Sequence, residues 1–325
     1  MAGIRLQDIT CVNSSSDIYL KRQWDTAHCG PAYAISMDIK YEDIMSVTDF
    51  HGIFIIDTVL NEEECFFIEK KITDYKSSLF IFKIIDPYFE YEKEKYFFKL
   101  LFRVARKQNV FFISTLHPAE VTLELDTFTN NQKLLFLPYP YQQTKEIEVD
   151  YQDFSRRKPL ICYSGAVNEL IYPNRSIFIK KWRRNPLLWN KIEYLKHPGY
   201  KDHGNKVIHQ LTGNEYIKHL SQYKTAFCDS SRSNLEFVKF GECAYAHCIP
   251  FGEAPASFSE EMKKYFIQID YQNFYSSIKK TLSISNEEQY GLSKQYRLAF
   301  KRERNKSLLQ SKLVDFVNKI SNSLS

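Results

Sequence analysis

Glycine is scarce in this sequence, and the glycine-rich motifs that hold nucleotide phosphates are absent. Ten of the 325 residues are glycine, and neither G-x-G-x-x-G nor a Walker-type G-K-[ST] occurs. The sequence also lacks H-E-x-x-H, G-x-S-x-G, Asp-x-Asp and any Cys/His cluster with zinc spacing. These absences argue against nucleotide binding by the two common glycine loops and against the hydrolases that carry such motifs.

Long apolar runs and paired cysteines are missing as well. The longest nearly uncharged apolar runs, such as residues 52–60, reach about half of the roughly 18 residues that a membrane span requires. The first 20 residues lack the apolar core of a signal peptide. The seven cysteines are odd in number, form no C-x-x-C pair and mostly sit in apolar runs. This usage predicts reduced, buried thiols and a soluble cytoplasmic protein, with peripheral contact at a membrane surface left open.

The composition favours a globular protein without a nucleic-acid partner. Forty-four Lys and Arg against 39 Asp and Glu give a formal net charge of +5, spread along the chain. That surplus is too small to predict nucleic-acid binding. With 44% hydrophobic and 26% charged residues, the chain is long enough for two domains of about 150 residues each.

Short apolar runs alternate with longer amphipathic stretches through the first half. Continuous hydrophobicity is typical of strands buried on both faces of a parallel sheet. Asn61 before three glutamates has the pattern of a helix N-cap. Strand alternating with helix predicts an α/β domain. The predicted strands are 51–59, 78–87, 109–118 and 133–140, and the predicted helices are 61–76 and 92–108.

A polar segment, 142–158, interrupts this pattern and predicts a linker between two domains. The second half then repeats the alternation of strand and helix. We therefore expect an N-terminal domain at 1–150 and a C-terminal domain at 151–325, the latter ending in helices. In the second half the predicted strands are 159–165, 191–197, 223–231 and 248–253, and the predicted helices are 176–185, 214–222 and 234–247.

Residues 214–253 contain the pattern with the most chemical content. The strand 223–231 ends in small polar residues, and the next helix carries Lys239 and Glu242 on one face. A strand-to-helix junction of this kind presents backbone N–H groups and a positive dipole end to a phosphate. A carboxylate one turn further along can accept both hydroxyls of a ribose. An exposed Lys–Glu pair on a surface helix is the alternative interpretation.

This stretch resembles the C-terminal nucleotide-binding domain of GT-B glycosyltransferases, in the group 1 and CgeB-like branch. There, a helix of the form [KR]-x-[FY]-E-x-x-A-x-G-x-[IVL]-P follows a strand and a loop bearing serine or asparagine. Lys239, Glu242 and Ala246 match this form. His247 stands where the family has glycine, and Gly241 stands where an aromatic residue precedes the glutamate. The start of the second half, residues 162–182, also resembles the loop and helix that lie near the donor phosphates.

The resemblance implies two Rossmann-like α/β domains facing across a cleft, with the acceptor on the first and a nucleotide-sugar donor on the second. It implies transfer of a glycosyl unit to a hydroxyl acceptor (a glycan, a lipid-linked acceptor or a small molecule) without a metal ion or other cofactor. A catalytically inert module, favoured by the two departures, and a sugar-nucleotide epimerase on the same fold remain alternatives. The implied donor-binding residues are Gly165, Arg175, Lys224, Ser230, Ser231, Ser233, Asn234, Lys239 and Glu242.

Catalysis in this fold usually involves a residue of the first domain. An inverting enzyme needs a base for the acceptor's proton, and such residues are expected at the carboxyl ends of strands. Asp57, Asp86 and His117 each follow a predicted strand. Each is equally a capping or turn residue, since Asp86 and His117 precede prolines.

Three basic segments suit contact with anionic lipid, as expected for a lipid-linked acceptor: the helix 92–108, the cluster 180–184 and the segment 301–306. For the helix, the alternative is a half-buried core helix with basic residues at its negative dipole end, and the other two segments carry the same ambiguity.

Overall fold

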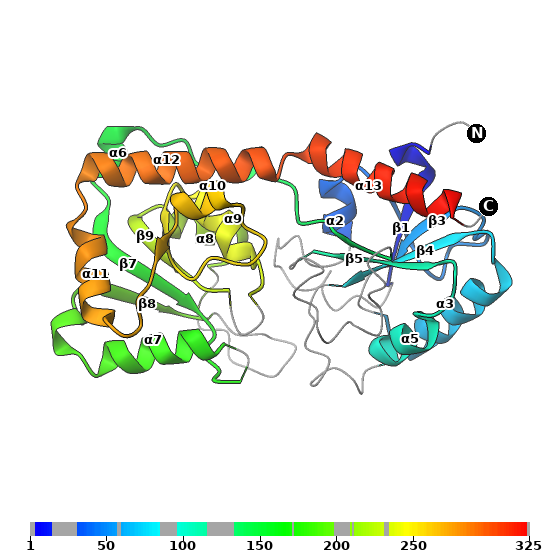
Figure 1. The fold of residues 1–325 in the computed structure, drawn as a ribbon, viewed down its shortest axis with the longest axis horizontal. Helices are drawn as coiled ribbons and strands as arrows, with labels where there is room; N and C mark the ends of the chain where they lie inside the picture. Colours follow the sequence, from blue (N-terminus) through cyan, green and yellow to red (C-terminus); the bar gives the residue numbers. More distant parts are fainter. Residues whose placement is uncertain are drawn as a thin grey trace. The chain divides into compact units, whose positions relative to one another are not determined.

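The computed structural model contains two compact α/β units (Figure 1). The first unit comprises Met1–Pro140 together with Arg304–Ser325, and the second comprises Tyr141–Glu303. Among the residues described, no helix is long and apolar enough to cross a membrane. The structure describes residues 4–14, 31–56, 60–84, 96–115, 133–170, 172–197, 209, 211–230 and 234–323.

The first unit is built on a six-stranded parallel sheet in the order β2-β1-β3-β4-β5-β6. Its strands β3, β4 and β5 are almost entirely buried because both faces of the sheet are covered, whereas the edge strand β2 is polar. The strands are β1 (Ile9–Asn13), β2 (Lys40–Asp43), β3 (Ile53–Ile56), β4 (Leu79–Ile84), β5 (Val110–Ser114) and β6 (Leu134–Phe136).

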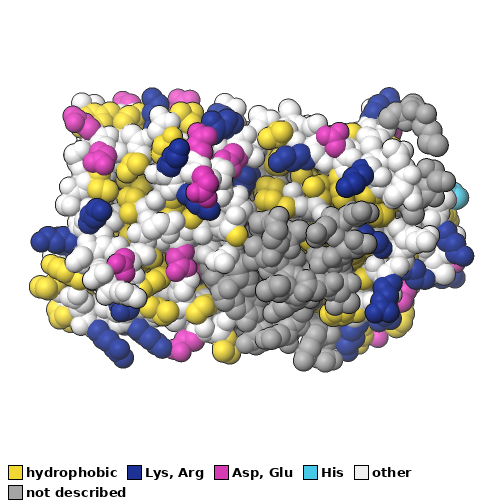
Figure 2. Space-filling view, in the orientation of Figure 1, with side chains coloured by type: hydrophobic (Ala, Val, Ile, Leu, Met, Phe, Trp, Pro, Cys, Tyr) yellow, Lys and Arg dark blue, Asp and Glu magenta, His cyan; other side chains and the backbone are white. Residues whose placement is uncertain are grey.

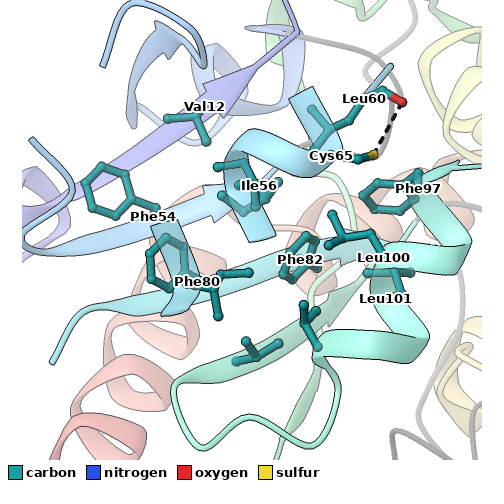
Figure 3. Packing of buried hydrophobic residues seen from close by; sticks show 14 of the residues in the cluster. Val12, Phe54, Ile56, Leu60, Cys65, Phe80, Phe82, Phe97, Leu100 and Leu101 are labelled. Carbon is teal, nitrogen blue, oxygen red and sulfur yellow. Dashed lines mark hydrogen bonds between the residues drawn. The ribbon is translucent and has the colours of Figure 1, made fainter. Parts of the chain in front are cut away.

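Successive side chains of β4 point to opposite faces of this sheet. Phe82 packs toward α3 and α5 on one face, where its ring centroid lies 6.0 Å from that of Phe97 (Figure 3). Ile81 packs with α2 and α13 on the other face. The helices are α2 (Pro31–Ser36), α3 (Glu62–Asp74), α5 (Tyr96–Val104) and α13 (Lys306–Asn322), and a 3₁₀ turn, η1 (Leu6–Asp8), precedes β1.

Two sequence-based expectations about these helices hold. Asn61 caps α3, since its side chain accepts a hydrogen bond from the backbone N–H of Glu64 at 2.9 Å. The described part of the helix predicted at 92–108 is α5, which buries its apolar face in the core. Arg103 near its end pairs with Glu69 of α3 at 2.7 Å. The alternative of a core helix is therefore the correct one for this segment.

The second unit is built on a five-stranded parallel sheet in the order β11-β10-β9-β7-β8. Helices α8, α9, α10 and α12 cover one face, and α7, η5 and α11 cover the other. The strands are β7 (Lys158–Gly165), β8 (Ile192–Lys196), β9 (Tyr223–Cys228), β10 (Ile249–Gly252) and β11 (Ile267–Gln268). The helices are η4 (Gln143–Lys145), α6 (Tyr151–Ser155), α7 (Pro173–Arg183), η5 (Pro186–Leu188), α8 (Gly213–Leu220), α9 (Val238–Tyr245), α10 (Glu260–Lys264), α11 (Phe274–Ser283) and α12 (Asn286–Glu303).

The division of the chain differs from the predicted domains at 1–150 and 151–325. Contacts place the boundary after Pro140, and they return the last helix, α13, to the first unit. This helix packs Leu313 and Val317 into the same cluster as Ile81. An apolar helix face predicts burial but does not say against which sheet, so the sequence could not assign α13.

The polar segment predicted as a linker, 142–158, is a folded part of the second unit. The backbone N–H of Ile147 donates to the carbonyl oxygen of Tyr245 at 2.9 Å. Glu146 forms ion pairs with Arg297 and Lys301 of α12. Polar residues of this segment therefore contact helices of the second unit.

Candidate functional site

The carboxyl ends of four parallel strands of the second unit meet at one edge of its sheet. Gly165 ends β7, Lys196 ends β8, Cys228 ends β9 and Gly252 ends β10. The register places Gly165 beside Lys196 and Gly252 beside Cys228. Open α/β sheets bind ligands outside this edge. The candidate site is built from residues at these positions and just beyond them.

Two cationic side chains stand over the backbone of Gly165. This glycine has a φ of +112°, and a Cβ atom added to it would lie 2.9 Å from Nη1 of Arg175 and 3.0 Å from Nζ of Lys239. Arg175 comes from the first turn of α7, and Lys239 comes from the first turn of α9. Glycine suits this position because it leaves room for both cations and accepts a positive φ. The two positive charges converge on one point, an arrangement that suits a diphosphate.

Arg175 is fixed by a buried ion pair and by an aromatic ring. Its Nε lies 2.5 Å from Oδ1 of Asp229, and the two side chains are 7% and 0% exposed. The guanidinium carbon lies 4.0 Å from the ring centroid of Tyr172. Because Asp229 takes up Nε, Nη1 is held over Gly165. The other oxygen of Asp229, Oδ2, is buried and has no hydrogen-bond partner among the described residues.

Lys239 and Glu242 are half-buried residues of α9. The Lys239 ammonium donates a hydrogen bond to the carbonyl oxygen of Ser164. Burial and the positive charge of Arg175 lower the pKa of Lys239, whereas burial raises the pKa of Glu242. The attraction between Lys239 and Glu242 opposes both shifts. This is a partly desolvated pair beside the candidate site, not the exposed surface pair of the alternative interpretation.

His197 and Tyr216 also face this edge, and neither was among the residues predicted from the sequence. His197 follows β8 directly, and burial together with the charges of Lys239 and Arg175 lowers its pKa to about 4. The Tyr216 hydroxyl, on α8, lies 2.5 Å from Oγ of Ser164. His197 stands at the carboxyl end of a predicted strand, so the rule that selected other strand ends could have found it.

Gly252 and Glu253 form the end of β10. Gly252 has a φ of +143°, and a Cβ atom there would overlap the carbonyl oxygen of Cys228, so only glycine fits. The Glu253 carboxylate accepts a hydrogen bond from the side-chain amide of Asn174. Burial and the negative charge of Asp229 raise the pKa of Glu253. Glu253 too follows a strand directly and was missed.

Lys224 does not reach this edge, which corrects its predicted place among the donor-binding residues. It is the second residue of β9, near the amino-terminal end of the strand. Four residues at about 3.3 Å each put it roughly 13 Å from Cys228 along the strand. Its ammonium donates to Oδ1 of Asn286 at the start of α12. Lys224 was selected because it lies on this strand, without regard to which end of the strand faces the site.

The loop after β9 brings two of the predicted donor-binding residues together. Oγ of Ser230 lies 3.5 Å from Oδ1 of Asn234, which has a φ of +52°. The helix begins at Val238 instead of 234, after an extended N-cap at Phe237, and Leu235 and Glu236 before it are buried. Five predicted site residues lie outside the described residues: Ser231 and Ser233 of this loop, and the candidate bases Asp57, Asp86 and His117.

The two departures from the family pattern lie away from the edge. His247 follows the C-cap of α9 with a φ of +55°, the left-handed position where helices commonly end in glycine. Gly241 packs against Phe300 of α12, where an added Cβ atom would lie 3.5 Å from Cζ. His247 therefore belongs to the end of α9 and Gly241 to its packing against α12, and neither alters the residues around Gly165.

Among the described residues, no group of three His, Cys, Asp or Glu side chains could hold a metal ion.

Neither a family model nor a curated protein matches this sequence, but solved structures match the fold. The Anabaena protein HepE, solved with UDP and glucose, aligns with a TM-score of 0.61 at 8% identity, over 96% of this chain and 99% of that one. An α-glucosyltransferase, solved with UDP-glucose and DNA containing an abasic site, aligns with a TM-score of 0.57 at 12% identity, over 95% and 98%.

A third structure, the N-terminal domain of trehalose-6-phosphate phosphatase from Candida albicans, aligns with a TM-score of 0.54 at 11% identity, over 89% of this chain and 76% of that one. Identities this low establish architecture and leave activity open. Two successive α/β units with parallel sheets, matched over nearly the whole chain, give this protein the fold of the GT-B glycosyltransferases.

Proposed function

We propose that the protein is a glycosyltransferase that binds a nucleotide-sugar donor at the Gly165 edge of its second unit and transfers the sugar to a hydroxyl acceptor. The convergence of Arg175 and Lys239 over Gly165 carries this proposal. Two fixed cations at the carboxyl edge of a parallel sheet match the two charged phosphates of a nucleoside diphosphate. Ordinary surface lysines and arginines are not held in this way by a glycine and a buried carboxylate.

Glu242 is proposed to accept hydrogen bonds from the ribose hydroxyls. It lies one turn beyond Lys239 on α9, so a ligand with its diphosphate at Lys239 can extend along this helix. The Lys239, Glu242 and Ala246 pattern is our reason for proposing the group 1 and CgeB-like branch. Two of the similar structures were solved with UDP and glucose and with UDP-glucose, which agrees with a nucleotide-sugar ligand.

In the proposed reaction, the bond between the anomeric carbon and the diphosphate oxygen breaks, and a bond from that carbon to the acceptor oxygen forms. The nucleoside diphosphate leaves with the electron pair, and Arg175 and Lys239 stabilise its charge, so we assign no role to a metal ion or other cofactor. The acceptor's proton passes to a base, for which Asp57, Asp86 and His117 of the first unit stay the candidates.

We propose that the reaction takes place in the cytoplasm. Six cysteines of the described part of the chain are free and buried, in keeping with a reducing compartment: Cys11, Cys65, Cys162, Cys228, Cys243 and Cys248.

Calorimetric titration with UDP, GDP, ADP, CMP and TDP tests the donor site. One nucleotide should bind, and Lys239→Ala should weaken its binding about tenfold to a hundredfold, because a hydrogen bond to a charged group is lost. Lys218→Ala removes an exposed lysine of α8 in the same unit and should leave the affinity unchanged. Equal effects of the two substitutions, or no binding of any nucleotide at millimolar concentration, would contradict the site.

Turnover distinguishes the proposed transferase from its two rivals. A transferase releases nucleoside diphosphate from its donor when a hydroxyl acceptor is present. An inert module binds the nucleotide without consuming any nucleotide sugar, and an epimerase changes the sugar without releasing diphosphate. Chromatography of the nucleotide pool after incubation separates the three outcomes.

A further inference from the structure

The second unit has a second surface of unusual composition, which lies around the turn η5. Helix α7 begins at Pro173, carries Arg175 of the candidate donor site in its first turn, and ends before β8 begins. Because the strands are parallel, the end of α7 and the turn η5 lie at the amino-terminal edge of the sheet, opposite the donor site. Changes made here therefore do not touch the proposed donor site.

Large apolar side chains project into solvent at this turn. Leu187 is 67% exposed and Trp189 is 60% exposed. Local hydrogen bonds hold this turn: the backbone N–H of Leu187 donates to Oδ1 of Asn185, and the indole N–H of the Trp189 side chain donates to the carbonyl oxygen of Arg183. A fixed turn that exposes two bulky apolar residues is typical of a contact surface.

A groove of about 270 Å³ adjoins these side chains, between η5 and α11. Its floor is apolar and includes Leu188 and Ile278. Lys191 and Lys279 line it as well, and both are exposed. The groove thus combines an apolar interior with positive charge at its border.

Acidic residues are missing from both segments that form this surface. No Asp or Glu occurs from 170 to 192 or from 271 to 286. Hydrophobic and basic side chains lie together along the lower left edge of Figure 2, where Figure 1 draws α7 and α11. Lys180 pairs with Glu169. Within the described part of the chain, these exposed cations form no ion pair: Lys181, Arg183, Arg184, Lys191, Lys279 and Lys280.

The other two basic segments of the sequence differ from this surface. Most apolar side chains of α5 are buried, with Phe102 42% exposed, and its Arg103 pairs with Glu69. Three cations of 301–306 form ion pairs: Lys301 with Glu146, Arg302 with Glu261 and Lys306 with Asp38. The fourth, Arg304, is buried.

We infer that the surface formed by Lys181, Arg184, Leu187, Trp189, Lys191 and Lys279, the Leu187 surface, binds anionic lipid bilayers. The unpaired cations attract the negative headgroups, while Leu187 and Trp189 enter the interfacial layer and the groove receives apolar lipid surface. A nucleic acid satisfies the cations but leaves the exposed apolar side chains without a partner. The inference stands independently of the donor site.

Flotation of the full-length protein with vesicles tests this inference. Vesicles of equal parts phosphatidylcholine and phosphatidylglycerol should bind the protein at least tenfold more strongly than vesicles of phosphatidylcholine alone. Lys191→Gln with Lys279→Gln should weaken binding to the anionic vesicles about tenfold or more, since each lysine near an anionic surface contributes about fivefold. Leu187→Ser should weaken it about tenfold, because its apolar side chain no longer enters the interface.

Matched controls change the same residue types on α13, in the first unit. Lys312→Gln with Lys319→Gln removes two exposed charges, and Leu308→Ser replaces a leucine that is 44% exposed. Both controls should bind vesicles like the unsubstituted protein, and thermal unfolding should show that all variants are folded. Equal loss in the control and test variants, equal binding to both kinds of vesicle, or lysine-dependent binding of duplex DNA without vesicle binding would overturn the inference.

Discussion

The guanidinium of Arg175 and the carboxylate of Asp229 form an ion pair at 2.5 Å that is almost completely shielded from water. The pair joins the first turn of α7 to the residue after β9, across 54 positions of sequence. Taking two charges out of water costs free energy, so such a pair adds less to stability than its distance suggests. Its effect is to fix the position of Nη1 over Gly165.

Asp229→Asn should lower the free energy of unfolding by about 3 to 5 kcal/mol, because it leaves the buried Arg175 charge without its counterion. Urea unfolding followed by far-UV circular dichroism measures this change. Glu169→Gln breaks the exposed ion pair with Lys180 and should change stability by less than about 1 kcal/mol. If the two variants lose equal stability, the pair is not structurally important.

Gly165→Ala should weaken nucleotide binding about tenfold. A Cβ atom would stand within 3.0 Å of both Arg175 and Lys239 and would displace the cations that hold the diphosphate. Gly291→Ala in α12 is the control, since an added Cβ atom there meets nothing within 4 Å. Gly291 lies inside a helix, where alanine is the better helix former. That control should bind normally and gain about 0.5 to 1 kcal/mol of stability. Unchanged affinity in Gly165→Ala would contradict the convergence of the two cations as the binding feature.

The sequence predicted the α/β class and the shared helix face of Lys239 and Glu242 for a physical reason. Strand periodicity and helix spacing are local, so the three-residue spacing of Lys239 and Glu242 is enough to place them on one face of a helix. Gly165 was named on a different ground, the resemblance of residues 162–182 to the loop and helix of the family.

Contacts between strands are not local, and this limited the prediction. His197 and Glu253 follow strands, so the strand-end rule could have named them as candidates. That they belong with Gly165 depends on β8 lying beside β7 and β10 beside β9, an order that the sequence does not display. Lys224 was misplaced for another reason: it is the second residue of β9, at the end of the strand away from the site. Arg175 could be named as a helix residue, but its ion pair with Asp229 depends on the same strand order.

Nucleotide affinity should decline on both the acidic and the alkaline side of neutral pH. The pH range of tight binding should be narrower than for a lysine and a glutamate with ordinary pKa values. Lys239 must be protonated to bind diphosphate, and burial and Arg175 lower its pKa below the usual value of about 10.4. Glu242 must be ionised to accept ribose hydroxyls, and burial raises its pKa above the usual value of about 4.3. Affinity therefore declines with rising pH earlier than for an ordinary lysine, and with falling pH earlier than for an ordinary glutamate.

Titration calorimetry across about pH 5 to pH 10 measures both limits. Lys239→Arg keeps its charge at all these values, so its alkaline decline should disappear while the acidic one remains. Glu242→Gln should remove the acidic decline relative to the unsubstituted protein, since the ligand's own titration is common to both. A variant profile with the same two limits as the unsubstituted protein would show that other groups set the pH dependence.

His247 is a buried histidine whose two ring nitrogens have no hydrogen-bond partner among the described residues. Its ring stacks on that of Tyr290 at 6.4 Å between centroids. Burial and the positive charges of Arg157 and Lys294 lower its pKa to about 4. The folded protein thus binds a proton at His247 less readily than the unfolded chain does, in which the pKa is about 6.5.

Stability should therefore fall on acidification, between about pH 6.5 and about pH 4, because the unfolded state takes up the proton first. His247→Asn removes this titration, and asparagine tolerates the left-handed backbone found there. Urea unfolding at neutral and acidic pH should show that the variant loses up to about 2 kcal/mol less stability than the unsubstituted protein over this range. His51→Asn, a change at an exposed histidine, provides the control for loss of an imidazole at the surface. If His247→Asn and the unsubstituted protein lose stability in parallel, the acid sensitivity arises elsewhere, and His197 beside Lys239 is then the next residue to replace.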